Sequence, residues 1–221
     1  TLHPTKLISK DHYKVAGDFS SASFLIVAGL IAKNSEILIK NVGLNQTRSG
    51  LLSVLKKMGA NIQILNQKTE CNEDVGDLLV KSSALHGIEI GGAIIPNIID
   101  EIPILSIAAS CAEGKTTIKD AKELRVKESD RLEAIASGLE VLNVTHHLYE
   151  DGIEISGVKE IVPSDQPIDS FDDHRIAMSF LISSLASSKD IKVMNCENIY
   201  TSFPSFFDEM KKIGLNMERY G

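Results

Sequence analysis

The apolar residues gather in three long runs, and each run is followed by the same series of shorter segments. In the first series, the side chains of 17–21 offer several helix caps before the apolar run 22–32, which predicts a buried helix. The pattern then predicts a strand at 36–40, an amphipathic helix at 47–58 and a second strand at 61–65. Gly59 follows the amphipathic helix directly, as glycine commonly does just beyond a helix end.

The same order of helix, strand, helix and strand recurs twice. Its predicted ranges are 102–112, 116–119, 128–142 and 144–148, then 175–186, 191–194, 203–213 and 215–218. The first helix of each series is apolar on all sides, so it is buried only if these helices meet inside and sheets cover them. The alternative to a threefold repeat is chance similarity between ordinary α/β segments. Asn143 weakens the evidence for a repeat, because the other two copies have glycine at that position.

Composition is that of an ordinary globular protein, with 221 residues and 43% hydrophobic content. A net charge of −7 without a basic run argues against nucleic acid or an anionic membrane as partner. No apolar run is long enough to span a bilayer. Three cysteines without CxxC spacing predict reduced thiols and a cytoplasmic location. The N-terminus has no signal pattern. The chain begins with Thr1 and not with Met, so one interpretation is a fragment or a processed piece with a missing partner segment.

Charges are densest in 123–131. If 127–131 forms the first turn of a helix, Lys127, Glu128 and Arg131 share one face, because residues three and four apart are neighbours. Such a face presents a proton-transfer group between two cations. A helix laced with weak surface ion pairs explains the same residues equally well.

Arginine is scarce in this chain, and three of its five copies lie near predicted helix starts, at Arg125, Arg131 and Arg175. A helix start disfavours a cation, whereas an anion bound there would reverse the cost. Compensation by neighbouring acids, such as Asp173 and Asp130, is the alternative.

Asp100 and His174 precede the second and third apolar helices. Asp100 is interpreted either as a helix cap or as a carboxylate that accepts a proton from a hydroxyl. His174 is interpreted as a proton carrier or as a local hydrogen-bond partner. The pair His146 and His147 has no third ligand at metal spacing, and the common nucleotide, hydrolase and zinc motifs are absent.

Six segments together resemble the C-terminal half of EPSP synthases (3-phosphoshikimate 1-carboxyvinyltransferases), which are enolpyruvyl transferases. They are 17–21 (GDFSS), 45–50 (NQTRSG), 95–103 (IPNIIDEIP), 123–131 (ELRVKESDR), 173–178 (DHRIAM) and 201–204 (TSFP). The resemblance implies an α+β fold, an inside-out domain of three βαβαββ repeats with buried helices and outer sheets. It implies the end of an N-terminal domain at 1–15 and a C-terminal domain at 16–221, with repeats at about 16–84, 85–158 and 159–221.

The activity implied by the resemblance transfers the enolpyruvyl group of phosphoenolpyruvate to the 5-hydroxyl of shikimate 3-phosphate. Asp100 then corresponds to the hydroxyl-side carboxylate, and Glu128 to the acid and base at the phosphoenolpyruvate methylene. Lys127, with Asp100, would bind shikimate 3-phosphate, whereas Arg131 and Arg175 would bind phosphoenolpyruvate. His174 lines the same site in the family. The resemblance implies no metal or organic cofactor, and it implies that the missing N-terminal half is a required partner.

Two positions depart from the enteric-type pattern of the family. Thr201 stands where that pattern has a lysine that contacts phosphoenolpyruvate, and Glu123 stands in place of an asparagine that contacts the sugar acid. Both residues are kept as further candidates for the site. Two other functions stay open: UDP-N-acetylglucosamine enolpyruvyl transfer, and anion binding without catalysis.

Overall fold

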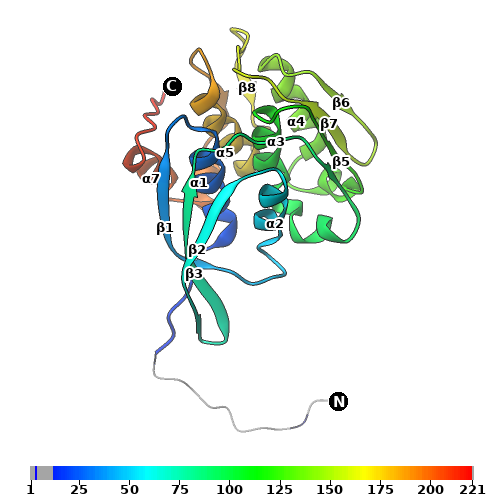
Figure 1. The fold of residues 1–221 in the computed structure, drawn as a ribbon. Helices are drawn as coiled ribbons and strands as arrows, with labels where there is room; N and C mark the ends of the chain where they lie inside the picture. The colour runs from blue at the N-terminus through cyan, green and yellow to red at the C-terminus, as the bar shows by residue number, and fades with distance from the viewer. Residues whose placement is uncertain (1–2, 4–11, 221) are drawn as a thin grey trace.

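Three mostly apolar helices lie side by side at the centre of the computed structural model, which describes residue 3 and residues 12–220 (Figure 1). They are α1 (Phe19–Ile31), α3 (Ile102–Ser110) and α5 (His174–Ser183), and each packs against the other two. Phe24, Phe180 and Phe206 are among the largest fully buried side chains. The predicted α+β fold with buried helices and outer sheets is confirmed. Most of the predicted segment 1–15 lies outside the described residues.

The first sheet covers α1 and has the strand order β1, β3, β2, with both pairs antiparallel. Its strands are β1 (Glu36–Gly43), β2 (Asn61–Glu70) and β3 (Glu73–Lys81), and α2 (Gly50–Lys57) joins the first two. The sequence pattern missed β3, because Gly76 and Asp77 interrupt its apolar residues. Asp77 fits there because it accepts hydrogen bonds from the backbone N–H of Asn41 and from the side chain of Asn66. Near Asp77 the pairing register of β3 shifts against both β1 and β2.

The second sheet covers α3 and has the order β4, β5, β7, β6. Its strands are β4 (Glu89–Ile90), β5 (Lys115–Ile118), β6 (His146–Leu148) and β7 (Ile153–Ser156). The other elements of this segment are α4 (Arg131–Val141) and the 3-10 helices η1 (Gly92–Asn97), η2 (Ile99–Glu101) and η3 (Lys122–Val126). The sequence analysis did not predict the short strands β4 and β7.

The third segment is the least regular. It holds β8 (Ile168–Asp169), β9 (Val193–Met194), η4 (Ser184–Ala186), α6 (Ile199–Ser202) and α7 (Phe206–Lys212). The strand predicted at 215–218 is wrong, since those residues form no regular structure. They follow Gly214, whose φ of +91° ends α7, but they pair with no neighbouring strand in the described structure.

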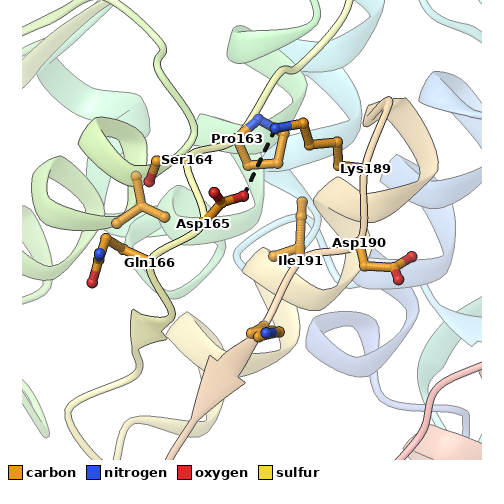
Figure 2. Close-up of a pocket in the computed structure, with 9 residues that line it drawn as sticks. Pro163, Ser164, Asp165, Gln166, Lys189, Asp190 and Ile191 are labelled. Carbon is orange, nitrogen blue, oxygen red and sulfur yellow. Dashed lines mark ion pairs between the residues drawn. The ribbon is translucent and has the colours of Figure 1, made fainter.

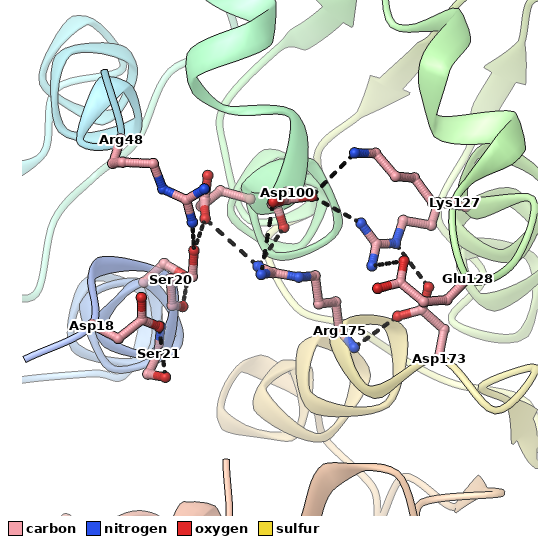
Figure 3. A network of polar contacts seen from close by, with 12 residues as sticks. Asp18, Ser20, Ser21, Arg48, Asp100, Lys127, Glu128, Asp173 and Arg175 are labelled. Atoms are coloured by element: carbon pink, nitrogen blue, oxygen red, sulfur yellow. Dashed lines mark hydrogen bonds and ion pairs between the residues drawn. The ribbon is translucent and has the colours of Figure 1, made fainter. Parts of the chain in front are cut away.

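A shared parallel pairing relates the three segments. The strands on either side of α3, β4 and β5, are parallel, as are β8 and β9 on either side of α5. At α1 the equivalent contact is a single parallel bridge between Gly17 and Val42. This common βαβ geometry places the N-terminal ends of α1, α3 and α5 near one another, where the charged residues meet (Figures 1 and 3).

Candidate active site

Arg131 is completely buried and contacts three carboxylates, those of Asp100, Glu128 and Asp173, which Figure 3 labels. Its Nε donates to Oδ2 of Asp173 at 2.8 Å, its Nη1 to Oδ1 of Asp100 at 3.2 Å, and its Nη2 to Oε2 of Glu128 at 2.6 Å. Charge-assisted bonds of this kind offset the large cost of removing a guanidinium from water. The acids therefore neutralise this cation.

The helix that carries Arg131 begins later than predicted. Asp130 is its cap, with Oδ1 accepting from the backbone N–H of Glu133 at 3.1 Å, so Arg131 is the first residue of α4. Lys127 and Glu128 lie in the connection before α4 and do not share a helical face with Arg131. The backbone of Lys127 is extended, which ends η3 and separates it from α4. Glu128 instead pairs locally with Arg131, and Asp100 joins Lys127 to Arg131 by contacting both.

Asp173 caps α5 and holds Arg131 with the same carboxylate. Its Oδ1 accepts from the backbone N–H groups of Arg175 and Ile176, while Oδ2 also accepts from Ser129 Oγ at 3.2 Å. Burial alone would raise the pKa of Asp173, but the bond from Arg131 and the backbone bonds lower it below its ordinary value. The carboxylate is therefore anionic at neutral pH, and it joins α4 to α5.

Asp100 lies in η2 and does not cap α3 with its side chain. It faces Arg131, Lys127 Nζ at 3.6 Å and Arg175 Nη2 at 3.9 Å. Burial would raise the pKa of Asp100, yet Arg175, Lys127 and Arg131 outweigh it and lower the pKa. The structure thus leaves a carboxylate that is one-quarter exposed among several cations.

Arg175 presents its guanidinium beside Asp100. Nη1 donates to the backbone carbonyl of Asp100 at 3.0 Å and lies 3.6 Å from Oε1 of Glu101. The side chain of Arg175 is 15% exposed, whereas that of Arg131 is fully covered. Of these two arginines, only Arg175 can contact an incoming anion without a rearrangement of its neighbours.

The remaining predicted residues differ in their placement. Burial and neighbouring Arg175 lower the pKa of His174, so its imidazole is neutral at pH 7. Glu123 pairs with Lys127 Nζ at 3.0 Å and is brought to the edge of the cluster. The hydroxyl of Thr201 donates within its own short helix, to the carbonyl of Asn198 at 2.8 Å. Arg125 binds Asp130 and backbone carbonyls of 149 and 150, which is a structural role.

Sequence reasoning missed three residues of the network, Ser20, Arg48 and Glu101. Ser20 Oγ donates to Glu101 Oε1 at 2.5 Å and accepts from Arg48 Nη2 at 2.9 Å. Arg48 is one of the scarce arginines, and Glu101 is an acid inside an apolar run, so both carried a usable signal. Ser20 carried none, because helix starts commonly contain serine.

Other features of the described residues give no competing site. No three acids, histidines or cysteines in this part of the chain could hold a metal ion. The described helices also lack the combination of length and apolar character needed to cross a bilayer. A surface hollow of about 280 Å³ lies away from the charged cluster, and Figure 2 shows Asp165 and Lys189 at it. Their ion pair is long, at 3.8 Å, and both side chains are largely exposed.

Comparison with known sequences shows which proteins this chain resembles. The family model of EPSP synthase (3-phosphoshikimate 1-carboxyvinyltransferase) matches residues 1–210. The 3-phosphoshikimate 1-carboxyvinyltransferase of Petrotoga mobilis is 56% identical over 209 residues, which are 95% of this chain and 48% of that protein. The enzyme of the same name from Geobacter metallireducens is 47% identical over 199 residues. The chain therefore spans about half the length of the curated relatives it matches.

Solved structures of EPSP synthases also resemble this chain. An EPSP synthase from Acinetobacter baumannii superposes with a TM-score of 0.89 at 39% identity, covering 92% of this chain and 47% of that one. The enolpyruvyl transferase NikO from Streptomyces tendae gives a TM-score of 0.72 over 89% of this chain. At 16% identity, NikO shares the fold and supports nothing further.

Proposed function

Because the chain belongs to the EPSP synthase family, we propose that it is the C-terminal half of a 3-phosphoshikimate 1-carboxyvinyltransferase. The full-length protein, meaning this chain joined to an N-terminal half, would transfer the enolpyruvyl group of phosphoenolpyruvate to the 5-hydroxyl of shikimate 3-phosphate. The observation that supports the reaction best is the position of Asp100, a partly exposed carboxylate among Lys127, Arg131 and Arg175. The same cluster offers a proton acceptor and cations for anionic substrates.

Asp100 is proposed to accept the hydroxyl proton of shikimate 3-phosphate as the oxygen attacks C2 of phosphoenolpyruvate. In the free protein its lowered pKa makes it a weak base. An anion bound beside Arg175 and Lys127 would offset their positive charge, which would raise the pKa of Asp100. Substrate binding would thus strengthen the base at the moment when it is needed.

Glu128 is proposed to protonate the methylene carbon of phosphoenolpyruvate and later to take a proton back. That return, with cleavage of the bond between C2 and the phosphate oxygen, would release phosphate and restore the double bond. The side chain of Glu128 is 52% exposed while one oxygen binds Arg131 at 2.6 Å. It is held at one end and open to a substrate at the other, as proton transfer requires.

Lys127 and Arg175 are proposed as the first contacts of the anionic substrates, Lys127 for shikimate 3-phosphate and Arg175 for phosphoenolpyruvate. Both side chains retain exposed surface, whereas Arg131 is enclosed by three acids. Arg131 could reach phosphoenolpyruvate only after the exposed Glu128 turned aside. Its proposed contact is therefore coupled to the position of the catalytic acid.

The N-terminal half is proposed as an obligatory partner, since this chain matches about half of its relatives. The division into a segment 1–15 and a domain 16–221, and a cytoplasmic location, are proposed with it. His174, Glu123 and Thr201 remain candidates for substrate contact. Of these, Glu123 has the clearest support, because its ion pair with Lys127 would set the position of that ammonium group.

The proposed function is tested by mixing this chain with a separately produced N-terminal half and measuring phosphate release. Turnover that needs both phosphoenolpyruvate and shikimate 3-phosphate is expected. Turnover with UDP-N-acetylglucosamine in place of shikimate 3-phosphate would show that the proposed acceptor is wrong. If the halves associate and bind phosphoenolpyruvate but release no phosphate, the chain is an anion-binding domain.

A further inference from the structure

Glu101 is a buried acid of the network to which the proposed reaction gives no part. It is 3% exposed and precedes α3, but its side chain caps no backbone N–H group of that helix. Burial raises its pKa, so keeping it ionised has a cost that helix capping does not offset. The Glu101 side chain accepts a hydrogen bond from Ser20 and forms an ion pair with Arg175.

The direction of the hydrogen bonds at Ser20 is fixed by its neighbours. A guanidinium can only donate, so Arg48 donates to the Ser20 oxygen at 2.9 Å. The single hydroxyl proton of Ser20 is then free to bind Oε1 of Glu101 at 2.5 Å. Serine thus links an exposed cation on the loop before α2 to a buried carboxylate before α3.

The same oxygen of Glu101 faces Arg175. Oε1 lies 3.6 Å from Nη1 of Arg175, and that nitrogen also donates to the Asp100 carbonyl at 3.0 Å. Nη1 is therefore held by one hydrogen bond, to the Asp100 carbonyl, and by an ion pair with Glu101, while Nη2 lies 3.9 Å from the Asp100 carboxylate. We propose that Glu101 is a positioning residue for the guanidinium of Arg175, and that Arg48 acts on it through Ser20.

This inference rests on the proposed function, in which Arg175 binds phosphoenolpyruvate. Loss of Glu101 would remove the buried anion beside Nη1 and leave Asp100 to hold the guanidinium, so more of the binding free energy would be spent on ordering Arg175. Glu101→Ala is expected to raise the KM for phosphoenolpyruvate about tenfold while the KM for shikimate 3-phosphate changes little. Glu101→Gln keeps an acceptor for Ser20, so its effect is expected to be smaller.

The experiment measures kcat and both KM values for the full-length protein, its Glu101→Ala, Glu101→Gln and Ser20→Ala variants, and the double variant of Ser20 and Glu101. Because the two residues act through one chain of contacts, the changes in log KM are expected to be less than additive. Glu113→Gln, whose carboxylate is 87% exposed, is the matched control.

The outcomes separate the two proposals. If the parent protein turns over and neither Glu101→Gln nor Ser20→Ala changes the KM for phosphoenolpyruvate, the positioning role is overturned while the function stands. Additive effects, or equal changes in both KM values, also overturn it. If the parent lacks turnover, the proposed function fails, and calorimetric affinity for phosphoenolpyruvate replaces KM in the same comparison. A parent that does not bind phosphoenolpyruvate overturns both proposals.

Discussion

Arg131 and Asp173 are both fully buried, and the Nε of the arginine donates to Oδ2 of the aspartate at 2.8 Å. The pair joins the first residue of α4 to the cap of α5, so two helices are positioned by one charge pair without access to water. Two opposite charges attract each other strongly in the protein interior. Removing one of them is costly, because it leaves the other charge buried and unpaired. The geometry of the site thus depends on this buried ion pair.

Asp173→Ala is expected to destabilise the full-length protein by about 3–5 kcal/mol, because it leaves the Arg131 guanidinium buried without its main partner. It also removes the cap of α5. Urea denaturation followed by circular dichroism measures the change. Asp165→Ala, which breaks a pair with a 97% exposed carboxylate, is the control and is expected to change stability by less than about 0.5 kcal/mol. Equal effects would contradict the burial argument.

Two buried acids are expected to give opposite pH dependence. The pKa of Asp173 is lowered from 3.8, so the unfolded state binds the proton first and stability is lost as pH falls below 3.8 toward the folded pKa. The pKa of Glu101 is raised from 4.5, so the folded state binds the proton first and stability increases as pH falls toward 4.5.

The corresponding measurement follows urea midpoints of the parent, Asp173→Asn and Glu101→Gln between pH 3 and pH 7. The advantage of the parent over Asp173→Asn should shrink below pH 3.8. Relative to Glu101→Gln, the parent should gain stability on acidification to pH 4.5. If the stability of the parent relative to each variant changed in the same direction on acidification, these carboxylates would not titrate as described.

The sequence predicted the buried helices well, because α1, α3 and α5 are apolar on nearly every side and need no tertiary context to be identified. It also found most charged residues of the candidate site, but not Arg48 and Glu101. It could not find how they meet, because Lys127 reaches Asp100, and Glu128 reaches Arg131, from a non-helical connection that helical spacing does not describe. Short strands such as β4 and β8 were missed, since two residues carry no periodicity.

Gly138 lies in α4, where a Cβ atom would stand 2.0 Å from Cζ of Phe180 on α5. Alanine has a higher helix propensity by about 1 kcal/mol, but overpacking typically costs about 1–3 kcal/mol. Because the contact is far inside van der Waals distance and the ring is buried, Gly138→Ala is expected to lower stability in urea denaturation. The exposed Ser137→Ala on the same helix should be neutral or slightly stabilising.

A rescue variant tests whether the clash is the cause. Combining Gly138→Ala with Phe180→Leu removes the ring atoms that the new methyl group meets. The double variant should lose less stability than the sum of the two single losses. Additive losses would mean that the ring and the methyl group do not compete for space.

Glu128 is the residue whose exposure and chemistry most directly test the proposed reaction. Glu128→Gln keeps the shape of the side chain and an oxygen that can accept from Arg131, but it cannot exchange a proton with phosphoenolpyruvate. Turnover of the full-length protein is expected to fall by roughly 10² or more with modest loss of substrate binding, as for a general acid and base. Phosphate release at saturating substrates measures it.

Glu133→Gln is the matched control for that measurement, because Glu133 is a 65% exposed glutamate in α4 whose nearest cation, Arg125 at 3.7 Å, has a structural role. It should retain the turnover of the parent. If Glu128→Gln also retained it, Glu128 would be no more than an ion-pair partner of Arg131. The proton for the methylene carbon would then have to come from another group, and Lys127, 22% exposed and already beside Asp100, would be the next to test.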